Sequence, residues 1–249
     1  MAGRRIYSII VFVSLALGWL AFKPPVQTPQ VLAGAVPLAP LTDGQRAALR
    51  KARNEYIGVQ QLNADRPEVH LNLGLLYARR GEFNKAEAAY RAAYRLHPGY
   101  TAAYVKLADL YREQGKADAG ERVLRQAMKL VPDDAAVHHA LGLLLIRQKR
   151  LTEALDALAQ AARSGPDNPR YGYVYAAALI ADGKRQPAIQ MLEQTHTRHP
   201  NDRDVLLALV IFNRDTGNLQ AANTYRQKLI ALSQQYPALD GLLGQLKNQ

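Results

Sequence analysis

The sequence contains no cysteine among its 249 residues. This absence excludes disulfide bonds, thiolate catalysis, zinc–thiolate sites and covalent c-type haem attachment. The sequence also lacks a nucleophile elbow with a Ser-His-Asp order, a phosphate-binding loop and a pair of carboxylates in an expected cleft. His196 and His199 lie three residues apart, but no second pair of metal ligands accompanies them. We therefore expect a non-enzymatic chain with no catalytic residue, no cofactor and no metal site.

Charged residues are absent from Ile6 to Phe22, a stretch of 17 residues between Arg5 and Lys23. As a helix this stretch is about 25 Å long, which is short but sufficient for a membrane span. A cleaved signal peptide is the alternative, but the small-residue site at 33–35 lies too far downstream. Arg4 and Arg5 place the N-terminus in the cytoplasm. We therefore predict a single-pass protein of the bacterial inner membrane, with residues 1–5 cytoplasmic, 6–22 in the membrane and the rest periplasmic.

Acidic residues are in the minority, since 32 lysines and arginines stand against 21 aspartates and glutamates, for a formal net charge of +11. The cations are scattered along the chain, as at Arg91, Arg95, Arg122, Arg125 and Lys129, and much of this surplus is interpreted as an ordinary solvated surface. The remainder favours contacts with anionic lipid headgroups or with an acidic protein. Nucleic acid is not an expected partner outside the cytoplasm.

One pattern returns every 34 residues between Pro67 and Tyr236. Three series of residues keep this step. They are Pro98, Pro132, Pro166 and Pro200; Gly81, Gly115, Lys149, Gly183 and Gly217; and the small residues Ala86, Gly120, Ala154, Ala188 and Ala222. Each unit shows an apolar helical run, a Gly or Lys turn and a second helical run that stops before the proline, which predicts a helix hairpin. The predicted units are 67–100, 101–134, 135–168, 169–202 and 203–236.

These units resemble the tetratricopeptide repeat family, which pairs Leu-Gly on the first helix with small and aromatic residues on the second. Leu73-Gly74 and Leu141-Gly142 match the Leu-Gly pair, whereas Leu107-Ala108, Tyr175-Ala176 and Leu209-Val210 are looser versions. The resemblance implies an all-α, right-handed solenoid of helix hairpins with a concave groove that holds other proteins. It implies no chemistry of its own.

The segments that flank the repeats have distinct patterns. Residues 23–41 hold five prolines and are predicted to form an extended linker. Residues 42–66 are predicted to form an N-terminal capping helix, a half repeat that opens with a capping box at Thr42 and Gln45. Residues 237–249 are predicted to form a C-terminal capping helix that covers the last hairpin.

In the tetratricopeptide repeat family, the groove is lined by fixed positions of each first helix, chiefly the fifth, ninth and twelfth. These inner positions give a predicted partner-binding groove of Leu71, Leu75, Val105, Asp109, Arg112, His139, Leu143, Ile146, Tyr173, Ala177, Ile180, Leu207, Ile211 and Arg214. The set is mostly apolar, and an apolar surface that faces solvent indicates that something covers it. We expect an external apolar or amphipathic segment, although superhelical coiling or the chain's own N-terminal segment is an alternative cover.

Three functions are consistent with a membrane-anchored solenoid. The first is a protein-interaction scaffold that holds a client during assembly or maintenance of an envelope or respiratory complex. The second is a permanent accessory subunit of an electron-transfer or photosynthetic-type membrane complex, and the third is a chaperone-like quality-control factor of the periplasm. Residues 63–77 also resemble the repeat tails that follow multihaem cytochrome modules in some bacteria, so we predict a link to electron-transfer complexes.

Overall fold

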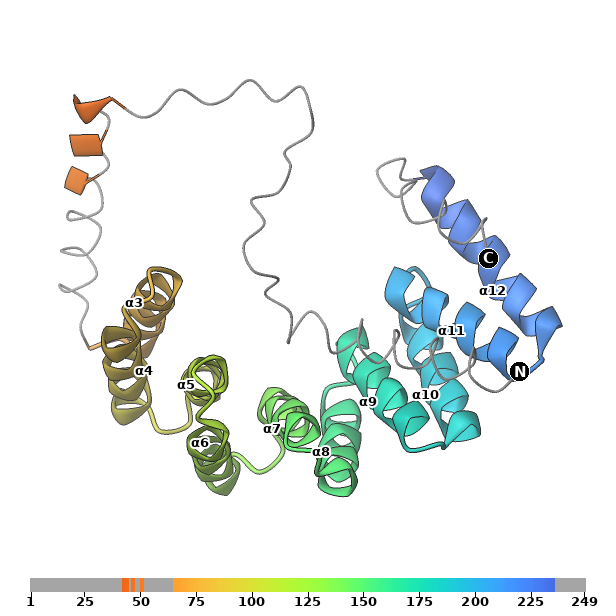
Figure 1. Ribbon diagram of the computed structural model, residues 1–249, viewed down its shortest axis with the longest axis horizontal. Coiled ribbons are helices and arrows are strands. Elements are labelled where there is room, and N and C mark those ends of the chain that lie inside the picture. Colours follow the sequence, from red (N-terminus) through yellow and green to blue (C-terminus); the bar gives the residue numbers. More distant parts are fainter. Residues whose placement is uncertain (1–41, 45, 48–49, 52–64, 236–249) are drawn as a thin grey trace. The chain divides into compact units, whose positions relative to one another are not determined.

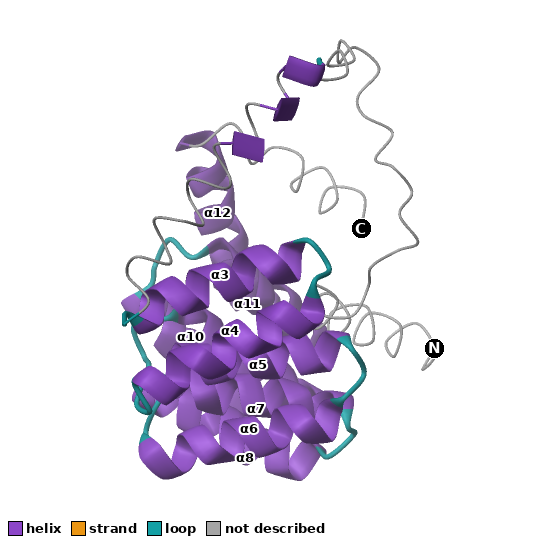
Figure 2. Ribbon diagram, turned by 90° about the vertical axis from the view of Figure 1, so that its left-hand side faces the viewer, coloured by secondary structure: helices purple, strands orange, loops and turns teal. Residues whose placement is uncertain are grey.

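The computed structural model describes residues 42–44, 46–47, 50–51 and 65–235, and all ten elements assigned within residues 65–235 are helices (Figures 1 and 2). The first helices of the hairpins are α3 (Pro67–Arg79), α5 (Thr101–Glu113), α7 (Ala135–Arg147), α9 (Pro169–Ala181) and α11 (Arg203–Asp215). The second helices are α4 (Phe83–Leu96), α6 (Ala117–Leu130), α8 (Leu151–Ser164), α10 (Arg185–Arg198) and α12 (Leu219–Gln235). Each first helix packs against the second helix that follows it. The prediction of an all-α array of helix hairpins is therefore confirmed for these residues.

The chain divides into two compact units at Pro132 and Asp133. The N-terminal unit contains α3 to α6, and the C-terminal unit contains α7 to α12. The right-handed coiling of the whole array stays a prediction from the resemblance.

The turn inside each hairpin is made by a residue with positive φ. Four of these residues are glycines, at positions 81, 115, 183 and 217, with φ between 74° and 82°. The fifth is Lys149, with φ 62°, and it is the one non-glycine residue with positive φ in the described part of the chain. Glycine adopts this left-handed conformation without a steric penalty, whereas lysine does not. The turn series read from the sequence thus marks one backbone conformation, which Lys149 adopts at a cost.

The helix ends also follow the predicted spacing. The helices α4, α6, α8 and α10 each end two residues before the proline of their repeat, because the residue before a proline disfavours the helical conformation. His97 and His199 are the residues that cap α4 and α10. At the other end of the hairpins, the carboxylates of Asp134 and Asp202 accept hydrogen bonds of 2.9 Å from the backbone N–H groups of Val137 and Val205.

Small residues let the two helices of a hairpin approach closely. Ala86, Ala154 and Ala188 are fully buried. A methyl group added at Gly142 would lie 2.5 Å from Leu158 Cγ, which leaves no room for any side chain larger than hydrogen. Gly74 is packed in the same way against the ring of Tyr90, and Gly172 against Thr195. The sequence analysis identified the first two glycines but not Gly172, which lies at a different position of its repeat unit.

Several predicted segments lie outside the described residues, namely the membrane anchor 6–22, the linker 23–41, most of the capping helix 42–66 and the capping helix 237–249. Residues 43–44, 46–47 and 50–51 are helical, and the backbone N–H of Arg46 donates to the carbonyl of Thr42 at 2.9 Å. No helix within the described part of the chain is both long enough and apolar enough to span a membrane.

Candidate protein-binding site

The predicted groove residues fall on the first helices of both units, and none of the fourteen is fully exposed. Ten are half-buried, whereas His139, Leu143, Ala177 and Ile180 are buried. The expectation that these positions face solvent is therefore wrong for four of them. All four lie on α7 and α9, whose sequences are apolar on nearly every side, and helices of that kind are covered by their neighbours.

In the N-terminal unit, α3 and α5 contact each other and present half-buried Leu71, Leu75 and Val105. The charged members of the set, Asp109 and Arg112, bind each other at 3.0 Å, and the Arg112 side chain is only 13% exposed. Their charges are therefore largely neutralised within α5. This face therefore presents apolar surface beside an ion pair whose two members already bind each other.

Tyr90 lies behind this face, packed against Gly74 and almost completely buried. Burial, with smaller contributions from Asp109 and Glu113, raises the pKa of Tyr90 to about 12. The phenol therefore stays neutral across the physiological pH range. Tyr90 is thus a buried, neutral side chain that packs against α3.

In the C-terminal unit, α9 and α11 contact each other and present half-buried Tyr173, Leu207 and Ile211. Burial raises the pKa of Tyr173 to about 12, and Asp204 at the start of α11 adds to the shift. Arg214 of the same face lies 3.4 Å from Asp215. The face is therefore again apolar, with one neutral phenol and a charge that has its own partner.

His139 is one of the buried inner residues of α7, and its ring packs on the ring of Tyr171 with centroids 4.8 Å apart. Burial, with a smaller contribution from the positive charge of Arg170, lowers the pKa of His139 to about 4. Its Nδ1 atom is buried and has no hydrogen-bond partner in the described part of the chain. The imidazole is therefore neutral near pH 7 and behaves as a packing residue.

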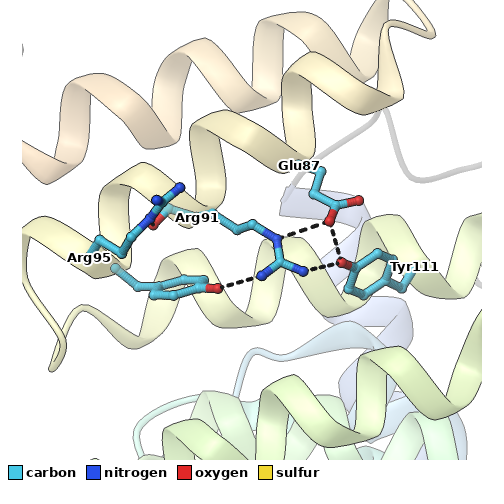
Figure 3. A network of polar contacts seen from close by, with 5 residues as sticks. Glu87, Arg91, Arg95 and Tyr111 are labelled. Carbon is cyan, nitrogen blue, oxygen red and sulfur yellow. Dashed lines mark hydrogen bonds and ion pairs between the residues drawn. The ribbon is translucent and has the colours of Figure 1, made fainter.

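A polar network between repeats, missed by the sequence analysis, joins α4 to α5 (Figure 3). The Arg91 guanidinium donates to the Glu87 carboxylate and to the Tyr111 hydroxyl, both at 2.9 Å, and Tyr111 donates to Glu87 at 2.6 Å. Burial opposes ionisation of Glu87, but the hydrogen bonds from Tyr111 and Arg91 outweigh it and lower the pKa of this carboxyl. The sequence places Arg91 among scattered cations that are interpreted largely as solvated surface. The structure shows that its partly exposed side chain also links the first repeat to the second.

A second cluster joins α10 to α12. Lys228 Nζ lies 3.0 Å from His196 Nε2, and the His196 ring meets Tyr225 edge-on. Burial and the charge of Lys228 lower the pKa of His196. Within the described residues, no three His, Cys, Asp or Glu side chains gather closely enough to hold a metal ion. His196 thus has a packing role between the last two second helices.

Comparison with known proteins identifies the architecture. Residues 67–110 and 105–169 match two family models, each described as Tetratricopeptide repeat. Among solved structures, MamA is 18% identical with a TM-score of 0.56, over 70% of this chain and 94% of MamA. MamA 41-end from Desulfovibrio magneticus RS-1 is 17% identical with a TM-score of 0.55, over 68% of this chain and 96% of that protein.

YrrB, described as a TPR protein with an unusual peptide-binding site, is 16% identical with a TM-score of 0.51, over 73% of this chain and 93% of YrrB. No curated protein sequence matches the chain. At these identities the structural likeness establishes the fold alone. Residues 67–169 are therefore similar to tetratricopeptide repeats, and the described helix hairpins have the fold of solved TPR proteins.

Proposed function

We propose that this protein is a non-catalytic scaffold that binds a partner protein on the inner faces of its first helices. The observation that carries the proposal is the incomplete burial of apolar side chains at the inner positions. Leu71, Leu75 and Val105 in one unit, and Leu207 and Ile211 in the other, are neither in the core nor fully solvated. Covering such side chains removes apolar surface from water and stabilises a complex.

The chemistry of these faces favours an apolar or amphipathic segment as the ligand. Their charged members Arg112 and Arg214 already bind the carboxylates of Asp109 and Asp215, so a partner gains little from adding another acid there. Tyr173 is an aromatic anchor with a neutral hydroxyl, the side-chain type that dominates binding energy at interfaces. YrrB, whose fold is similar, is described as having a peptide-binding site.

The cellular setting of the scaffold rests on the sequence. The uncharged stretch 6–22 after two arginines supports a single-pass inner-membrane anchor with the repeats in the periplasm. In that position the scaffold would hold a client while an envelope or respiratory complex is assembled. A permanent subunit or a quality-control factor would use the same faces and differ in how long the partner stays bound.

The face assignment is tested with the tagged full-length chain, extracted in mild detergent and analysed by mass spectrometry. Truncating Tyr173→Ala together with Ile211→Ala should lower the recovery of bound partner about tenfold or more, because central aromatic and aliphatic anchors carry most of an interface's binding energy. The matched control is Leu219→Ala, an apolar truncation on α12 at a residue that is 61% exposed. Circular dichroism should show the same helicity in all three proteins.

Full recovery of the partner by the double variant would refute the assignment. A stoichiometric companion that survives a salt wash would identify a permanent subunit. Many substoichiometric companions lost in salt would identify a transient scaffold or chaperone, and haem proteins among them would support the electron-transfer link.

A further inference from the structure

The second helices of the N-terminal unit end in two exposed leucines. Leu96 and Leu130 are the last residues of α4 and α6, and they are 47% and 48% exposed. They lie 34 residues apart, at the same position of successive repeats. Because α5 packs against both α4 and α6, the two helices belong to one compact unit. The repeat therefore places both leucines at one edge of that unit.

Cations surround these leucines. Arg95 and Lys129 directly precede them and are exposed, and Arg122 lies two turns back on the exposed side of α6. Neither Arg122 nor Lys129 forms an ion pair with any described residue, and no acidic residue occurs between Arg122 and Leu130. We call Arg95, Leu96, Arg122, Lys129 and Leu130 the leucine–basic surface.

The later repeats do not share this combination. At the position of the two leucines, α8 has Ser164, α10 has Arg198, and α12 has Leu232, which is half-buried and follows Ala231 instead of a cation. The second helix α8 also carries Glu153 and Asp156 on its exposed side, with a single cation, Arg163. A cation in the last turn favours any helix end, but that effect gives no reason for an exposed leucine beside it. The pairing is thus a property of the first two repeats alone.

We propose that the leucine–basic surface docks on an anionic lipid membrane. Exposed leucines among cations are complementary to a bilayer surface, where phosphates lie directly above an apolar layer. Each lysine or arginine near an anionic surface contributes about a fivefold factor in affinity, which is weak for a free protein. On a chain held near the bilayer by the predicted anchor and linker, a weak contact is sufficient because the effective concentration is high. This docking is independent of partner binding on the inner faces.

The absence of cysteine makes a direct test possible, because one introduced thiol can be labelled with a fluorophore without background. The full chain carrying Leu130→Cys or Leu96→Cys is reconstituted in vesicles of phosphatidylcholine, with or without about one-third phosphatidylglycerol. Nitroxide groups on the lipid chains quench a fluorophore only when it reaches the bilayer. The matched control is Ser164→Cys, the same repeat position on α8.

We expect labels at 96 and 130 to be quenched more strongly than the label at 164, in vesicles containing phosphatidylglycerol only. Arg122→Gln should lower the ratio of docked to free surface about fivefold, and about 0.5 M salt should abolish the difference. Equal quenching at 130 and 164, or quenching that ignores lipid charge, would overturn the proposal. Labels that lipid never quenches but an acidic protein shields would overturn it too, in favour of a protein partner. Circular dichroism of both leucine variants should match that of the wild-type chain, which checks that the repeats remain folded.

Discussion

A substitution at Lys149 tests the energetic cost of a left-handed backbone conformation at a turn where side-chain contacts do not contribute. It is exposed, and its φ of 62° matches the 74–82° of the four glycines at the equivalent turns. A methyl group added at any of those glycines would meet no atom within 4 Å. The difference between lysine and glycine at this turn is therefore the intrinsic cost of the left-handed conformation. Lys149→Gly should raise the free energy of unfolding.

The magnitude follows from two opposing effects. Lysine in the left-handed conformation carries a strain of about 1–2 kcal/mol, and replacing it by glycine removes that strain. Glycine also gives the unfolded chain more conformations, which costs about 0.4–1 kcal/mol of stability. The net gain is about 1 kcal/mol, which corresponds to about 2–4 °C in melting temperature for a chain of this size.

The assay is thermal and urea unfolding of the full chain, followed by circular dichroism at 222 nm. The converse variant Gly115→Lys is the control, because it introduces the same strain at an equivalent open turn and should lower stability by a similar amount. An unchanged or lower midpoint for Lys149→Gly would refute the reasoning. It would mean that the lysine side chain contributes interactions at least as large as the strain.

Two further predictions concern buried residues. Gly142→Ala should lower the free energy of unfolding by about 1–2 kcal/mol, because the new methyl group would lie 2.5 Å from Leu158 Cγ and 3.3 Å from the carbonyl of Ala154. A urea midpoint at or above that of the wild type would contradict this close approach. The lowered pKa of His139, about 4 in the folded chain, means that the unfolded chain binds the extra proton as pH falls below about 6.5. The free energy of unfolding should therefore drop by about 2 kcal/mol between pH 7 and pH 5, and His139→Leu should remove that part of the drop. An identical pH dependence in both proteins would show that His139 is not buried as a neutral group.

Much of the fold was predictable because it depends on local chemistry. A proline near a helix end and a left-handed turn residue act within a few residues of themselves, so their 34-residue spacing predicted each hairpin. The buried alanines follow from the same register, because a small residue is required wherever two helices cross closely. The inner positions were taken from the family pattern, and their role in binding stays a prediction.

The positions where the helices begin, turn and end could be predicted from local sequence, because those features depend on the backbone of neighbouring residues. The accessibility of each side chain could not, because burial depends on which residues a neighbouring helix places opposite. Tyr171 of α9 lies against His139, which the repeat pattern alone places in an open groove. Tyr111 reaches Glu87 across 24 residues and converts Arg91 from a surface charge into a link between repeats. Such contacts join residues far apart in the chain, so no local pattern contains them.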